Sequence, residues 1–160
     1  MGSITDLILL IVIANGIPVF MRFVFGGYCA WPIDFGKQLA DGEPILGKSK
    51  TWRGVLTTMA VTPFFAFLLG YSPETGFLVA AFSMLGDLVS SFIKRRMHMR
   101  PSSMALFLDQ IPEALFPAVV LMDVFNLNIG SVILVVTIFI VVELLLSRLL
   151  YKWGVRKRPY

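Results

Sequence analysis

The chain has 160 residues, of which 57% are hydrophobic and only 15% are charged, and its mean hydropathy is +0.80. Soluble domains average about 45–50% apolar and about 25% charged residues, so this composition excludes an ordinary soluble enzyme and indicates an integral membrane protein. The single cysteine, Cys29, excludes an intrachain disulfide, and with the single histidine, His98, it cannot form a Cys/His zinc cluster. We therefore expect one domain, 1–160, that is an all-α bundle of transmembrane helices.

Five apolar stretches approach the roughly 20 residues that a bilayer-spanning helix needs. The expected spans are about 4–25, 52–70, 76–93, 103–124 and 129–151. Two connections, 71–75 and 126–128, are short, whereas 26–51 and 94–102 are longer and polar. The first apolar stretch has no basic start and no small-residue cleavage pattern, so we expect it to be retained as a span.

The basic residues determine the expected orientation. With five spans, all fourteen Lys and Arg residues fall on one side of the membrane, in the two longer loops, the C-terminal tail or the adjoining helix ends. The positive-inside rule places this side, with the C-terminus, in the cytoplasm and the N-terminus outside the cell membrane. Anionic headgroups or a phosphorylated substrate then account for the net charge of +4, and no nucleic-acid partner is required.

Two aspartates lie inside the expected spans. Asp87 precedes Lys94 by seven residues and Asp109 follows the start of the fourth span by about as many, so both lie roughly 10 Å from the cytoplasmic end. A charged Asp near the bilayer centre costs about 2.5–3.5 kcal/mol. We expect the two acids to face one another across a polar cavity open to the cytoplasm and to hold Mg²⁺, which takes one or two carboxylates and completes its shell with water and substrate phosphates. The alternative is that each acid pairs with an interior arginine or a helix end.

The spacing after Asp87 sharpens this hypothesis. Positions i, i+3, i+4 and i+7 share one helix face, and here they are occupied by Asp87, Ser90, Ser91 and Lys94. A metal ligand, two hydroxyls and an ammonium in line would form a track for a polyphosphate. In the alternative interpretation the serines are packing residues and the basic run that begins at Lys94 only anchors the helix at the interface.

The second aspartate has its own neighbours. Asp109 and Glu113 are again four residues apart, with Pro112 between them, and the proline should kink or break the helix beside the acid. Such breaks are tolerated inside membranes where they line a cavity. Glu113 either supports the site or is capped by a neighbour, and the isolated Glu143 is expected to pair with an interior polar group.

The first long loop contains the letters of a Walker A motif in "GEPILGKS", Gly42–Ser49. A P-loop requires a preceding buried strand and a parallel sheet, which a bundle of spans does not provide. Basic and hydroxyl residues nevertheless gather before the N-terminus of the second span, where backbone N–H groups favour an anion. These candidate phosphate-binding residues are Lys48, Lys50, Thr51 and Arg53; the alternative is an ordinary positive-inside flank.

Two motifs together resemble a known family. "GDLVSSFIKRR", Gly86–Arg96, followed by "LDQ" is similar to the signature of the CDP-diacylglycerol synthase superfamily, in which G-D-x-x-x-S-x-x-K-R precedes a D-R pair. The short chain, "DGEPILGKSKTWRG" and "LDQIPE" resemble its archaeal branch, the CDP-archaeol synthases. The resemblance implies Mg²⁺-dependent transfer of CMP from CTP to the isoprenoid lipid 2,3-bis-(O-geranylgeranyl)-sn-glycerol 1-phosphate, which gives CDP-archaeol and pyrophosphate.

The resemblance also implies roles for individual residues. Asp87 and Asp109 become Mg²⁺ ligands, Ser91 takes the place of the family serine, and Lys94 with Arg95 takes that of the K-R pair, with Lys94 as a catalytic group. Two departures are that the bacterial H-G-G stretch is absent and that Gln110 follows the second aspartate in place of arginine.

Two other functions fit some of the same residues. One is a CDP-diacylglycerol synthase acting on ester phosphatidate, because ether and ester tails both need only an apolar groove. The other is a small ion- or proton-coupled transporter in which Asp87 and Asp109 relay ions, although transporters more often contain inverted repeats and none is apparent here. The sequence does not specify the oligomeric state.

Overall fold

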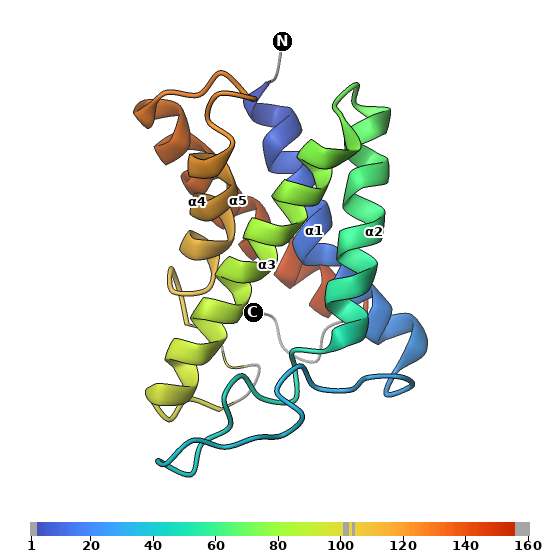
Figure 1. Ribbon diagram of the computed structural model, residues 1–160, viewed down its shortest axis with the longest axis vertical. Helices are drawn as coiled ribbons and strands as arrows, with labels where there is room; N and C mark the ends of the chain where they lie inside the picture. The colour runs from blue at the N-terminus through green and yellow to red at the C-terminus, as the bar shows by residue number, and fades with distance from the viewer. Residues whose placement is uncertain (1–2, 101–102, 104, 156–160) are drawn as a thin grey trace.

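The computed structural model describes residues 3–100, 103 and 105–155 (Figure 1). The described chain forms five α-helices: α1 Ile4–Phe25, α2 Trp52–Leu68, α3 Pro73–Arg96, α4 Gln110–Val120 and α5 Ile129–Lys152. Within these residues the only β-type pairings are two isolated bridges in the first long loop. The expected all-α class is confirmed; the basic residues of the C-terminal tail at 156–158 lie outside the described residues.

Four helices begin at a side chain that caps their first backbone N–H groups. The capping residues are Ser3, Thr51, Ser72 and Asn128, which accept hydrogen bonds from Asp6, Gly54, Thr75 and Ser131. Ser, Thr and Asn are favoured at this position because the side-chain oxygen satisfies a donor that has no partner within the helix. Pro73 follows such a cap at the first helical position, where its missing N–H costs nothing, and α3 therefore starts three residues before the expected span.

The fourth segment differs most from the expected span of 103–124. Its helix covers only the 11 residues Gln110–Val120, about 16 Å at 1.5 Å per residue, and 106–109 form turns before it. Pro112 lies in the first turn of the helix, where a missing N–H is tolerated. The Gln110 side chain accepts a hydrogen bond from the Phe107 N–H at 2.9 Å, and the Asp109 carboxylate accepts one from the Ala105 N–H at 3.2 Å, so two N–H groups ahead of the helix have partners.

Helix length and composition support a multi-pass membrane protein. Among the described residues α1, α3 and α5 are long and apolar enough to cross a bilayer, and α2 is a shorter apolar helix. Large apolar side chains are exposed along the bundle, among them Phe67, Ile129 and Ile133 at 63%, 76% and 63%. Exposed apolar surface on this scale marks contact with lipid or a partner. The number of spans stays a prediction.

The helices alternate in direction (Figure 1). The N-terminus and the two short connections lie at one end of the bundle, and the loop 26–51 and the start of the α3–α4 connection lie at the other. α3 is central, in contact with α1, α2 and α4. It approaches α2 closely at Gly76, where a Cβ atom would lie 2.6 Å from the Ala66 Cβ and the Pro63 Cα.

Candidate functional site

α3 and α4 approach one another closely at Gly86, one residue before the first predicted metal ligand. A Cβ atom built on Gly86 would overlap the Pro112 carbonyl group and would lie 2.6 Å from the Glu113 backbone nitrogen. Glycine therefore allows the start of α4 to cross directly over α3 at this point. The crossing brings the acids of α4 to the level of Asp87.

Lys50, from the end of the first long loop, forms an ion pair with the Asp87 carboxylate and contacts both of its oxygens. Both side chains are 20% exposed. The Lys50 ammonium also interacts electrostatically with Glu113 and Asp109, so a single cation faces three carboxylates from two helices.

Lys94 forms the second ion pair of the cluster. Its ammonium lies 2.7 Å from Asp109 and donates a hydrogen bond to the Ser103 carbonyl at 3.1 Å. It also interacts electrostatically with Asp87, so each lysine faces both aspartates. The structure therefore gathers Asp87 and Asp109 into one cluster, and the cations that pair with them are lysines rather than the arginines considered as an alternative.

Glu113 completes the cluster on the α4 side. Its side chain is buried, 6% exposed, and it interacts with Asp87, Lys50 and Glu143. The i, i+4 spacing from Asp109 indicated Glu113 but left its role open, since the sequence alone does not place α4 against Gly86. Through its interaction with Glu113, Glu143 of α5 also lies beside the cluster.

The hydroxyls of the predicted phosphate track are buried inside the bundle. Ser90 is fully buried and donates to the Asp87 carbonyl at 3.0 Å, and Ser91 is 3% exposed. In this arrangement the Ser90 hydroxyl is hydrogen-bonded to a backbone carbonyl of its own helix, α3. A contact between either serine and a phosphate stays a prediction.

Arg95, the other half of the predicted K-R pair, is 2% exposed. One terminal nitrogen donates to the Arg100 carbonyl at 2.9 Å, and the guanidinium faces Asp109 and Glu43 electrostatically. Its Nε and its second terminal nitrogen have no hydrogen-bond partner in the described part of the chain. A buried guanidinium with free N–H donors is suited to a phosphate, which arginine binds through two parallel hydrogen bonds.

The four candidates of the first loop have different positions. Lys50 alone contacts the acids. Thr51 caps α2, Lys48 is exposed, and Arg53 donates to the Tyr28 carbonyl and, at 3.0 Å, to the Gly26 carbonyl, which joins α2 to the end of α1. The Walker letters at 42–49 run through turns and bends that no strand precedes in the described residues, so they do not form a P-loop.

The shape of the first loop depends on Asp34. Its carboxylate accepts hydrogen bonds from the backbone N–H groups of Leu46 and Gly47, both at 2.8 Å, and of Gly36 at 3.0 Å. Burial acts to raise the pKa of Asp34, but these three donors outweigh it and hold the pKa below the ordinary value of 3.8. The loop that ends in Lys50 is therefore folded around a buried charge.

Arg96 and His98, which both follow Lys94 in the chain, connect the end of α3 to the first long loop. Arg96 pairs with Asp41 and donates to the Pro44 carbonyl at 2.7 Å, and the His98 ring lies 3.3 Å from Glu43. The sequence indicated only an interfacial anchor for this arginine. A basic run gives no signal for such a partner, because the loop lies more than fifty residues earlier in the chain.

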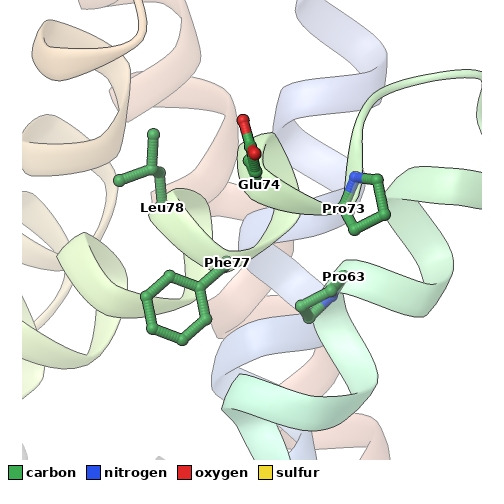
Figure 2. A pocket seen from close by; sticks show the side chains of 5 residues that line it. All are labelled: Pro63, Pro73, Glu74, Phe77 and Leu78. Atoms are coloured by element: carbon green, nitrogen blue, oxygen red, sulfur yellow. The ribbon is translucent and has the colours of Figure 1, made fainter.

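Two hollows on the outside of the described bundle are apolar and lie away from these charges. One of about 480 Å³ lies between α2 and α3 near the N-terminal end of α3 (Figure 2), and it is lined by Pro63, Pro73, Glu74, Phe77 and Leu78. It is therefore not the predicted polar cavity, which stays a prediction.

The residues that could hold a metal are carboxylates. No group of three or more His, Cys, Asp and Glu side chains within metal-binding reach occurs among the described residues. Mg²⁺ needs only one or two protein carboxylates when substrate phosphates supply further ligands. Asp87 and Asp109, both paired with a lysine, fit that requirement.

Fold and site together define a helical membrane protein with a buried cluster of acids and cations suited to phosphate chemistry. A family model described as "CarS-like: CDP-archaeol synthase" matches residues 4–71 and 64–160. The CDP-archaeol synthase of Pyrococcus horikoshii is 34% identical over 158 residues, 92% of this chain and 89% of that protein. The enzyme of Pyrobaculum calidifontis is 31% identical over 172 residues and 100% of both chains.

One solved structure also matches this fold. It is described as an intramembrane enzyme for archaeal membrane lipids biosynthesis, and it aligns with a TM-score of 0.69 and 23% identity over 87% of this chain and 91% of that one. The chain belongs to the CDP-archaeol synthase family. Membership confirms the resemblance found in the sequence and the expected enzyme class, a CTP-dependent cytidylyltransferase, and it removes the reason to consider an ion transporter.

Proposed function

We propose that this protein transfers CMP from CTP to 2,3-bis-(O-geranylgeranyl)-sn-glycerol 1-phosphate at the cytoplasmic face of the cell membrane, giving CDP-archaeol and pyrophosphate. The observation that carries the proposal is the cluster in which Asp87 and Asp109 alternate with Lys50 and Lys94, in a chain of this family. Replacing buried ion pairs by well-packed apolar residues is often neutral or stabilising, so such a cluster is better explained by function than by stability.

A divalent cation, Mg²⁺ in this proposal, would be held by Asp87 and Asp109. When bound, it would neutralise charge on the phosphates of CTP. The carboxylates are hard oxygen donors of the kind Mg²⁺ prefers. The nearby Glu113 places a third carboxyl group beside Asp87 and Lys50.

The side chains of this protein bind and orient the reactants. Lys94 and Arg95 bind the β- and γ-phosphates, and the free N–H groups of Arg95 make it the stronger candidate for a bidentate contact. A phosphate oxygen of the lipid attacks the α-phosphorus of CTP, the bond from this phosphorus to the bridging oxygen breaks, and pyrophosphate leaves with the electron pair. The lipid phosphate is already ionised, so positioning and charge neutralisation suffice and no general base is needed.

The lipid chains require only apolar surface. The exposed apolar sides of the bundle let the isoprenoid chains lie against the helices while the headgroup phosphate reaches the acids. We infer that the ether lipid is preferred over the ester lipid, and pyrophosphate release with each lipid distinguishes these two substrates.

Pyrophosphate release by the purified protein tests the reaction. We expect release with CTP, Mg²⁺ and the di-ether lipid phosphate, little release with diacyl phosphatidate, and at least about a hundredfold loss of kcat in Asp87→Asn and in Asp109→Asn, because removing charge-stabilising groups typically costs about that much. Chelation of the metal should abolish the reaction, and added Mg²⁺ should restore it.

The control is Asp123→Asn, an isosteric change outside the cluster, in the α4–α5 connection at the other end of the bundle. It should retain wild-type turnover. Equal release with the diacyl lipid would replace the proposed substrate by ester phosphatidate. Absence of release with either lipid, from folded protein, would overturn the proposed function.

A further inference from the structure

We propose that Lys50 is a displaceable counter-ion of the metal site: in the free enzyme its ammonium holds the carboxylates together, and it moves to the nucleotide phosphates when a divalent cation enters with CTP. The inference rests on the proposed function of Asp87 as a metal ligand. It also predicts an order of binding. A metal ion alone competes with Lys50 for Asp87, whereas a metal ion that enters with CTP does not, because Lys50 then binds the phosphates.

The position of the Lys50 ammonium carries the inference. It contacts both oxygens of Asp87 and interacts with Glu113 and Asp109. A divalent cation bound to Asp87 would need the same oxygens. The two cations therefore exclude one another at this carboxylate.

The charge of the cluster explains why a counter-ion is present. Asp87 and Glu113 interact with one another, and Glu113 also faces Glu143. Carboxylates at such close range repel unless a cation or a shared proton compensates. The Asp87 and Glu113 carboxyl groups share a hydrogen bond, and Lys50 adds a positive charge before any metal binds. This charge keeps the acids assembled and lowers the affinity for a metal without nucleotide.

Lys50 is better suited to this exchange than Lys94. The Lys94 side chain lies on a helix, is only 9% exposed and also donates to the Ser103 carbonyl at 3.1 Å. The Lys50 side chain is 20% exposed and no further hydrogen bond of its ammonium is observed among the described residues.

Hydrogen bonds hold the Lys50 backbone, whereas its side chain is held at the ammonium by the Asp87 carboxylate. Its N–H donates to the Gly47 carbonyl at 3.2 Å and its carbonyl accepts from the Ile33 N–H at 2.9 Å. We therefore expect a change of rotamer, rather than a movement of the loop, to carry the ammonium from Asp87 to a triphosphate, which offers it a stronger charge.

Mn²⁺ binding to the purified full chain tests the exchange, measured by electron paramagnetic resonance without nucleotide and with CTP carrying a methylene group between the α- and β-phosphorus. We expect Lys50→Met to bind Mn²⁺ alone about tenfold more tightly than the wild type, about 1.4 kcal/mol. The analogue should tighten Mn²⁺ binding much more in the wild type than in the variant. Lys37→Met removes the same charge from an exposed position of the same loop and should match the wild type.

Lys50→Gln is measured in parallel, and circular dichroism and gel filtration establish which variants are folded. A folded Met or Gln variant that binds Mn²⁺ alone no more tightly than the wild type would overturn the inference. Pyrophosphate release by the wild-type protein in the same preparation would leave the proposed function intact. A wild type that neither binds Mn²⁺ with the analogue nor releases pyrophosphate would overturn both.

Discussion

Gly86 determines how near the acids of α4 come to Asp87. The Gly-Asp pair of the signature thus combines two requirements: an aspartate for a cation, and beside it a residue without a side chain, so that the Pro112 and Glu113 backbone can cross α3. In close helix contacts small residues are selected for such approach. The glycine is therefore as much a part of the site as the acid that follows it.

Replacing this glycine should separate α4 from α3. We expect Gly86→Ala to lower the free energy of unfolding by about 1–3 kcal/mol, the usual cost of overpacking, and to reduce kcat strongly because Asp109 and Glu113 move away from Asp87. Thermal unfolding in detergent and pyrophosphate release measure the two effects.

Gly16→Ala is the matched control, because a Cβ atom at that position in α1 has no atom within 4 Å. It should leave turnover unchanged and stabilise the helix by about 0.5–1 kcal/mol. Wild-type turnover and stability in Gly86→Ala would contradict the role assigned to the close crossing.

At the scale of elements, the first long loop is an ordered part of the site. Asp34 binds three backbone N–H groups of the loop, and Arg96 at the end of α3 holds the loop through Asp41 and the Pro44 carbonyl. These contacts position the backbone from which Lys50 reaches Asp87.

Removal of the Asp34 carboxylate should loosen this loop. A hydrogen bond to a charged group contributes about 1.5–3 kcal/mol, so Asp34→Ala should raise the rate of trypsin cleavage after Lys48 and Lys50 by at least about tenfold. Gln38→Ala, an exposed residue of the same loop, should be cleaved at the wild-type rate. Equal cleavage of Asp34→Ala and wild type would show that the loop is held elsewhere.

The same carboxylate makes the loop sensitive to acid. Because the folded pKa of Asp34 lies below the ordinary value of 3.8, its stabilising contribution is complete above that value and is lost as the pH falls through the lowered folded pKa. We expect the amide protons of Leu46 and Gly47 to keep their exchange protection from neutral pH down to about pH 4 and to lose it below. Loss of protection near pH 6 would point to another group.

At the scale of the whole molecule, sidedness decides which substrates reach the cluster. The loop 26–51 and the start of the α3–α4 connection share one end of the bundle (Figure 1), as the distribution of basic residues requires. The positive-inside rule predicts that this end faces the cytoplasm, where CTP is available. Cys29 is exposed and lies in this loop.

The single cysteine allows this orientation to be measured in the unmodified chain. A membrane-impermeant maleimide should label Cys29 in inverted membrane vesicles and not in intact cells. The variant Cys29→Ala with Glu74→Cys, which moves the thiol to an exposed position at the opposite end of the bundle, should show the reverse pattern. Labelling of Cys29 in intact cells would reverse the predicted topology.

The sequence by itself determined the membrane class, the family and most helix starts, and it singled out the two aspartates that the structure brings into one cluster. Caps such as Ser3 and Asn128 act over three or four residues, and the signature 86–96 lies on one helix. Their effects are local and can therefore be predicted from the sequence. The expected first span, 4–25, coincides with α1 for the same reason.

The tertiary structure decided which cations meet the acids. Lys48, Lys50 and Arg53 look equivalent in the sequence, yet only Lys50 reaches Asp87, 37 positions along the chain. The choice of Lys50 depends on how Asp34 folds the loop, and the pairing of Lys94 with Asp109 depends on how closely α4 approaches α3 at Gly86. Both are packing contacts between distant segments, and no local pattern of residue types specifies them.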